Sequence, residues 1–205
     1  MWIRFRAPYF YSFKEFAAYC GIVYNLFVQE YLSEAIVLNK EANGDLDIRV
    51  AFFTKKFGKL KAKAKSARKI TSKLSGHLEP GFLSQVRLVE KNGLQVVDAL
   101  KKSFLDLNLP DLRRLEKILA EGEPDHKIWH MLAQNTLDWE EILKILGWDP
   151  AFAHCSHCGK STPALFDSRN QEFFCRDCLG KFQKEHYVKR YAEDIIEIIP
   201  QGSFA

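Results

Sequence analysis

The sequence predicts an α+β fold, in which a small five-stranded β-barrel precedes an α-helical region that carries a four-cysteine module. Short strand-like segments with turn signals reach residue 100, leucines take a helical spacing after residue 101, and two Cys-x-x-Cys pairs follow. The 205 residues exceed one average domain. We therefore expect an extension of residues 1–31, a barrel domain of residues 32–100 and a helical domain of residues 101–205.

Residues 1–31 are rich in aromatic side chains and turn apolar from Phe16 to Val28. This apolar run of thirteen residues is shorter than the ~18 that a membrane-spanning helix needs, so we expect no membrane span. The segment can be an amphipathic extension, a secretion signal or an artefact of a start codon placed too far upstream. The downstream cysteines, which fit a reducing cytosol, and the basic strand argue against a secretion signal. Of the remaining two interpretations we favour the artefact.

The strands of the barrel are predicted from alternation and turn residues. Ala35–Leu38 and Leu46–Phe53 flank the turn signal Asn43-Gly44-Asp45, which indicates a hairpin. Gly58 marks the next turn, and Leu60–Lys65 alternates with period two. A short helix over Thr71–Leu78 and two strands, Phe82–Glu90 and Leu94–Leu100, around Asn92-Gly93 complete the inventory. Five strands with an inserted helix are typical of an OB-fold barrel.

The helices after Lys101 are predicted from apolar spacing and capping residues. One helix carries Leu109, Leu112, Leu115 and Leu119, and a second follows the capping residue Asp125. A third helix runs from about Asp138 to Leu146, where Gly147 provides a C-terminal stop. The spacing of Tyr187, Tyr191, Ile195 and Ile198 predicts a final amphipathic helix that ends at Pro200.

The two Cys-x-x-Cys pairs are the most specific motif. Sixteen residues separate them, which fits a tetrahedral zinc site with the ligands Cys155, Cys158, Cys175 and Cys178. Four thiolates leave no open position for water, so we expect one structural Zn²⁺ per chain. Redox dithiols and an iron–sulfur cluster are the alternatives. Cys20 is left outside the motif.

A run from Lys55 to Lys73 holds nine basic residues and no acidic one, within a chain whose net charge is only +4. Alternation places Lys59, Lys61, Lys63 and Lys65 on one strand face, ~7 Å apart, where we expect no carboxylate to neutralise them. Such a face favours a nucleic-acid groove, and a merely solvated face is the alternative. The candidate DNA-binding residues are Lys55, Lys56, Lys59, Lys61, Lys63, Lys65, Arg68, Lys69 and Lys73.

Three nearby aromatic residues, Phe52, Phe53 and Phe57, can offer stacking surfaces for bases. We expect two of them to face the barrel core, which leaves one at most. The sequence contains no G-x-x-x-x-G-K-[ST], H-E-x-x-H or G-x-S-x-G motif. No catalytic residue can be named, and we expect the chain not to be an enzyme.

Several of these segments resemble one known family in order and spacing. Glu34–Leu38, Phe53–Leu60, the Lys65–Lys73 basic segment and Leu78–Pro80 are similar to the N-terminal domain of the RecO recombination-mediator family. Leu146–Pro150, followed by the two cysteine pairs, is similar to the helical domain of that family with its zinc module. The resemblance covers roughly Glu34 to Tyr191.

The resemblance implies a DNA-binding recombination mediator in recombinational repair of damaged DNA. Such a protein binds single- and double-stranded DNA, anneals complementary strands and assists the loading of RecA recombinase onto DNA coated by single-strand-binding protein. Implied partners are RecR and the acidic C-terminal tail of single-strand-binding protein, and the implied location is the bacterial cytoplasm, at the nucleoid. The alternative is a zinc-ribbon nucleic-acid-binding adaptor of a transcription or translation complex.

Overall fold

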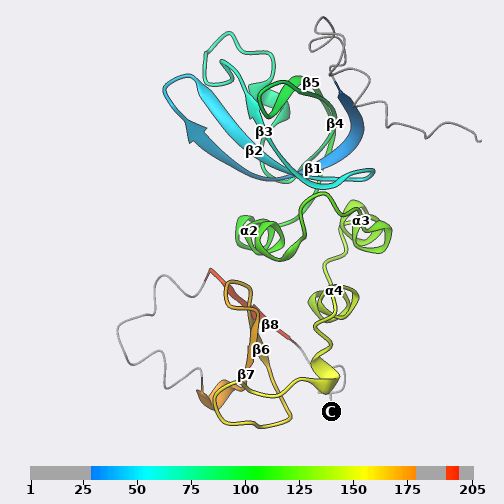
Figure 1. Ribbon diagram of the computed structural model, residues 1–205, viewed down its shortest axis with the longest axis vertical. Coiled ribbons are helices and arrows are strands. Elements are labelled where there is room, and N and C mark those ends of the chain that lie inside the picture. The colour runs from blue at the N-terminus through cyan, green and yellow to red at the C-terminus, as the bar shows by residue number, and fades with distance from the viewer. Residues whose placement is uncertain (1–28, 179–192, 199–205) are drawn as a thin grey trace, which may run out of the picture.

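The computed structural model describes residues 29–178 and 193–198. Figure 1 shows a barrel at one end, three helices in the middle and a small sheet at the other end. The predicted extension lies outside these residues, except for the three that precede Leu32. Within the described part of the chain, no helix is long and apolar enough to cross a membrane.

The barrel contains the five expected strands. Their bounds are β1 (Glu30–Asn43), β2 (Asp47–Thr54), β3 (Gly58–Ala64), β4 (Phe82–Glu90) and β5 (Leu94–Phe104). The strands close in the order β1-β2-β3-β5-β4, with β3 and β5 parallel and the other neighbouring strands antiparallel. The prediction of five strands followed by helices is confirmed.

Strand β1 is much longer than the apolar run Ala35–Leu38 suggests, because it pairs with two neighbours. Its first half pairs with β4 and its second half with β2, and the register shifts between Val37 and Asn39. The hydrophobic pattern marks only the buried centre of the strand, since its ends are more exposed. The predicted helix over Thr71–Leu78 is only the 3₁₀ turn η1 (Ser75–His77), in keeping with the poor helix propensity of its Ser75-Gly76 start.

Both faces of β1 and β2 are buried, and each face belongs to a different core. Val37, Val50 and Phe52 point into the barrel. Ile36 and Phe53 point outward, to a second core that continues through the helices to the small sheet. The outer face of the barrel is therefore covered where these residues lie.

Three short helices follow the barrel: α2 (Leu109–Ile118), α3 (His126–Ala133) and α4 (Trp139–Ile145). Helices α2 and α3 lie against the barrel, and α4 lies between them and the small sheet (Figure 1). Their N-caps are Asn108, Asp125 and Asp138, and each side chain accepts a hydrogen bond from the backbone N–H three residues later. The three helices predicted between Lys101 and Gly147 are confirmed. Phe53 packs against Trp129 of α3, with ring centroids 5.9 Å apart, which joins barrel and helices.

A turn of 3₁₀ helix, η2 (Pro150–Phe152), leads to a small sheet with the strand order β7-β6-β8. Its strands are β6 (Leu165–Asp167), β7 (Glu172–Phe174) and β8 (Ile195–Glu197). The predicted final helix is wrong at Ile195, where the chain forms β8. Ile196 and Ile198 are buried and Glu197 is exposed, which is the period of a strand. Tyr187 and Tyr191 lie outside the described residues.

Gly58 is the point where the β2–β3 turn touches the segment after α2. Its φ is +66°, and a Cβ atom would lie 2.2 Å from the backbone oxygen of Glu123. Gly44, in the β1–β2 turn, also has a positive φ of +78°, but a Cβ atom there would meet nothing within 4 Å. A substitution at Gly44 therefore causes backbone strain alone, whereas one at Gly58 causes backbone strain and steric overlap.

We expect Gly44→Ala to lower the free energy of unfolding by about 1–2 kcal/mol, because only the left-handed conformation is penalised. Gly58→Ala should lower it by a further ~1–3 kcal/mol, because the methyl group also forces the β2–β3 turn away from Glu123. Urea denaturation of both variants measures the difference. Equal losses would contradict the close approach of barrel and helices at Gly58.

Candidate nucleic-acid interface and metal centre

Lys59 does not lie on a free face of the barrel. Its side chain is buried beneath α2, and its Nζ donates a hydrogen bond of 2.8 Å to the backbone oxygen of Glu116. That carbonyl is in the last turn of α2, where backbone oxygens lack partners within the helix. Burial lowers the pKa of Lys59. Lys59 is therefore a helix cap between barrel and α2.

Lys61 and Lys63 are also neutralised, contrary to the expectation of an uncompensated lysine face. The Nζ of Lys61 lies 3.2 Å from Glu116 and 3.9 Å from Glu121, and the Nζ of Lys63 lies 2.8 Å from Asp47. The acidic partners come from α2, from the segment after it and from the start of β2. They are distant from Lys61 and Lys63 in the sequence, so a count of charges along the run misses them. The expectation that no carboxylate neutralises this strand face is wrong at Lys61 and Lys63, and the expectation that the face is free is wrong at Lys59.

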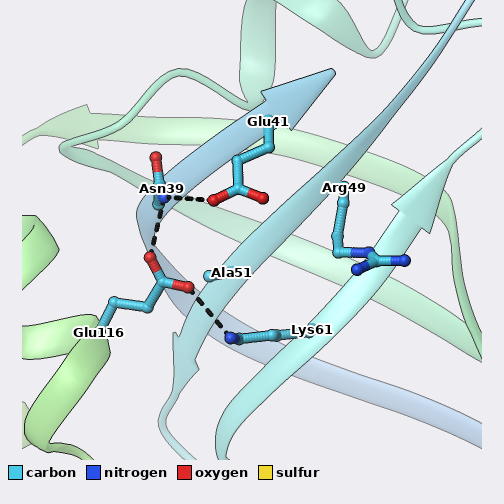
Figure 2. Close-up of a pocket in the computed structure, with 6 residues that line it drawn as sticks. All are labelled: Asn39, Glu41, Arg49, Ala51, Lys61 and Glu116. Atoms are coloured by element: carbon cyan, nitrogen blue, oxygen red, sulfur yellow. Dashed lines mark hydrogen bonds and ion pairs between the residues drawn. The ribbon is translucent and has the colours of Figure 1, made fainter. Parts of the chain in front are cut away.

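A shallow groove beside Lys61 shows how this charge balance arises (Figure 2). It is lined by Asn39, Glu41, Arg49, Ala51, Lys61 and Glu116. Glu116 accepts hydrogen bonds from Asn39, at 2.9 Å, and pairs with Lys61. The two cations and two carboxylates among the lining residues balance, so this groove carries no net positive charge.

The β2–β3 turn holds the next two candidate residues. Lys55 lies 3.6 Å from Glu34, which also accepts a hydrogen bond of 2.5 Å from Lys102. That hydrogen bond lowers the pKa of Glu34, with burial opposing and the charges of Lys102 and Lys55 assisting. Lys56 is exposed and forms no ion pair with the described residues.

The remaining four candidates lie together in the segment between β3 and η1. We name residues 65–74 the basic loop; its cationic residues are Lys65, Arg68, Lys69 and Lys73. All four are exposed, and none forms an ion pair with a carboxylate in the described ranges. The loop contains no acidic residue. Of these four cations, Lys65 interacts with a nearby carboxylate: the pKa of Asp47 is lowered mainly by its hydrogen bond with Lys63, and the charge of Lys65 assists. The loop therefore holds most of the unpaired charge of the predicted basic run.

The barrel fixes the base of the basic loop. Ala67 is 2% exposed and packs in the barrel interior. The backbone N–H of Ser66 donates to the Asp47 carboxylate at 2.7 Å, and the N–H of Arg68 donates to the Leu46 oxygen at 2.9 Å. The side chain of Arg68 also donates to the oxygen of Gly44, at 3.0 Å. The cationic side chains are thus presented beside the β1–β2 turn.

Two of the three aromatic residues considered for base stacking are buried in the protein, as expected. Phe52 is buried in the barrel interior, and Phe53 is buried in the second core beneath the helices. Phe57 is half-buried and meets Tyr31 edge to face, with centroids 5.1 Å apart. Base stacking on Phe57 stays a prediction.

The four predicted cysteine ligands come together. One sulfur atom from each of Cys155, Cys158, Cys175 and Cys178 lies within 4.8 Å of the others, a cluster that could hold a metal ion. The first pair follows η2 and the second follows β7. Gly159, with a φ of +73°, lets the chain turn after Cys158, and its N–H donates to the Cys155 oxygen at 2.8 Å.

The surroundings of the cluster give Cys155 and Cys178 very different pKa values. Burial raises the pKa of Cys155, but the backbone N–H groups of Cys175, Cys158 and His157 outweigh it and lower that pKa to about 6. Burial and hydrogen bonding with the other thiols raise the pKa of Cys178 to about 12. A cation among these sulfur atoms would favour the thiolate form of all four.

Comparison with known proteins extends these observations. Residues 28–104 match the family described as Recombination protein O N terminal. A "DNA repair protein RecO" of Thermodesulfovibrio yellowstonii is 28% identical over 183 residues, which cover 77% of this chain and 72% of the relative. The matches confirm the resemblance to the RecO family. RecO proteins of Alkaliphilus metalliredigens (26% identical; 72% of each chain) and Bacillus pumilus (24%; 73% of this chain, 68% of the relative) match as well.

The RecO match agrees with the strand bounds of the barrel. The family match of residues 28–104 encloses β1 to β5, which run from Glu30 to Phe104. The alignments with RecO relatives extend over 175 to 183 residues, so they include the helical region as well as the barrel.

Lys59 and Lys65 provide a matched test of buried and free cations on this barrel. We expect Lys59→Ala to lower the free energy of unfolding by about 1–3 kcal/mol, because the Glu116 carbonyl loses its donor and the lysine stem its packing. Lys65→Ala should change it by less than about 0.5 kcal/mol. Urea denaturation measures both values, and a Lys59→Ala variant as stable as Lys65→Ala would refute the capping role.

Proposed function

We propose that this chain is a DNA-binding recombination mediator that acts in DNA repair without catalysing a reaction. The cations of the basic loop carry the proposal, because the barrel presents them at the surface without ion pairs to carboxylates of the described residues. Similarity to proteins named DNA repair protein RecO, over 72–77% of the chain in the first three relatives, supports the same function.

The mechanism follows from the charge of the DNA backbone. Cationic side chains that contact phosphates release condensed counterions, and this release drives binding to any sequence. The same contacts reduce the repulsion between two strands, so complementary strands can pair on the protein surface without a chemical fuel. Lysines outnumber arginines in the basic loop, which favours phosphate contact over bidentate reading of bases.

The resemblance to RecO also supports the proposed partners. We propose that the chain binds single- and double-stranded DNA, RecR and the acidic tail of single-strand-binding protein, and that it assists the loading of RecA. The proposed location is the cytoplasm, at the nucleoid.

For the cysteine cluster we propose one structural Zn²⁺. Four sulfur ligands suit Zn²⁺ and complete its tetrahedral shell, so no position is left for a reacting water. The adjacent sheet has strands of only three residues, which are too short to be stable alone. A metal ion would tie the segment before β6 to the segment after β7.

The first functional prediction concerns phosphate contacts. We expect the double variant Lys69→Ala/Lys73→Ala to bind single-stranded oligonucleotides of any sequence more weakly and to anneal complementary strands more slowly. The slope of log affinity against log salt should fall by about 0.7 per lost contact. Fluorescence anisotropy over a salt series measures the slope, and a strand-annealing assay with single-strand-binding protein measures the second effect.

The control is Lys127→Ala/Lys144→Ala, which removes the same charge from exposed sites on α3 and α4. This variant should bind and anneal like the wild type. Equal behaviour of the two double variants would show that net charge, and not the basic loop, sets DNA affinity.

The second functional prediction concerns the metal. Protein purified in metal-free buffer should contain one Zn²⁺ per chain, and Cys175→Ser should lose it together with thermal stability, because folding and metal binding are coupled. Cys20→Ser is the control, since Cys20 lies outside the motif and should leave the zinc content unchanged. Elemental analysis measures the ratio; a zinc-free wild type would exclude a zinc site.

A further inference from the structure

The basic loop carries an apolar side chain at its tip. Ile70 has a relative exposure of 105%, the highest of the exposed large apolar residues in the described part of the chain. The backbone N–H of Ser72 donates to the Lys69 oxygen at 2.9 Å, which closes a turn with Ile70 and Thr71 at its corner. Ile70 therefore points away from both cores.

Backbone hydrogen bonds and buried neighbours define the conformation of the loop around Ile70. The N–H of Lys69 donates to the Ser66 oxygen at 3.2 Å, directly before the turn. Ala67 on one side and Leu78 on the other are buried in the barrel interior. The residues on both sides of the turn are thus anchored in the barrel, and the turn holds Ile70 at the surface.

The surroundings of Ile70 indicate the chemistry of its partner. Lys69 precedes it, and Arg68 and Lys73 lie within three residues, all exposed and without a carboxylate partner among the described residues. An exposed apolar side chain among free cations fits a polyanion that also has apolar surfaces. Single-stranded DNA has this composition, because its phosphates alternate with flat base faces that are not enclosed in a duplex.

We propose that Ile70 inserts between neighbouring bases of single-stranded DNA while the cations of the basic loop contact the flanking phosphates. Aliphatic side chains of minor-groove-binding proteins insert between base steps of duplex DNA and unstack them, and the bases of a single strand are more accessible still. The inference rests on the proposed DNA-binding function and adds a base contact to it. A side chain that contacts base faces leaves the Watson–Crick edges free, so insertion is compatible with annealing.

The test compares Ile70→Ser with Ile70→Leu and with Phe152→Ser, which alters another exposed apolar residue, 81% exposed, on η2. Ile70→Ser should weaken binding to a mixed-sequence oligonucleotide by about 5- to 20-fold, from the loss of a partly buried aliphatic contact. The salt slope should stay unchanged, because no phosphate contact is lost. Ile70→Leu and Phe152→Ser should bind within about twofold of the wild type.

A second readout reports on the bases directly. An oligonucleotide that contains 2-aminopurine should become brighter on binding the wild type, as its base is unstacked, and should brighten less with Ile70→Ser. An abasic oligonucleotide should bind the wild type and Ile70→Ser equally, because it has no base faces. A urea midpoint equal to that of the wild type checks that Ile70→Ser is folded.

The outcomes separate this inference from the proposed function. If Ile70→Ser binds like the wild type while Lys69→Ala/Lys73→Ala binds more weakly, the base contact is refuted and DNA binding by the basic loop stands. If Ile70→Ser lowers the salt slope, Ile70 acts through the neighbouring cations and the insertion is also refuted. If the wild type itself binds DNA without salt dependence, both proposals fail.

Discussion

The burial of the outer face of β1 and β2 beneath α2 and α3 is the constraint on which the rest of the structure depends. Ile36 and Phe53 pack there with residues of the helices, and the same core continues to Phe166 and Ile196 of the small sheet. At the margin of this core, the Lys59 ammonium caps the last turn of α2. One continuous apolar core thus joins the barrel, the helices and the strands beside the cysteine cluster.

This packing also decides which cations are available to a partner. Because α2 lies against the barrel, Glu116 and Glu121 reach Lys61 of β3 and neutralise it. The basic loop leaves the barrel at the other end of β3, beside the β1–β2 turn, where none of its cationic side chains forms an ion pair with a carboxylate of the described residues. Strand β3 therefore has the buried, structural Lys59 near its start and is followed at its end by the basic loop, the proposed DNA contact.

Local signals in the sequence predicted local structure well. Asp125 and Asp138 marked helix starts, the Asn92-Gly93 turn placed a hairpin, and the spacing of the cysteines identified the cluster. The errors concern contacts between distant segments. Alternation placed Lys61 on the correct side of β3, but the sequence does not show that α2 packs there. Ile195 and Ile198 matched a helical spacing, whereas pairing with β6 made that segment a strand.

We infer that the basic loop, and not the outer face of β3, contacts DNA. Photo-cross-linking of the full chain to a single-stranded oligonucleotide, with the modified peptides mapped by mass spectrometry, tests this claim most directly. We expect the cross-links to fall within residues 65–74. Cross-links confined to Lys59, Lys61 and Lys63 would contradict this claim, because they would place the DNA on the outer face of β3.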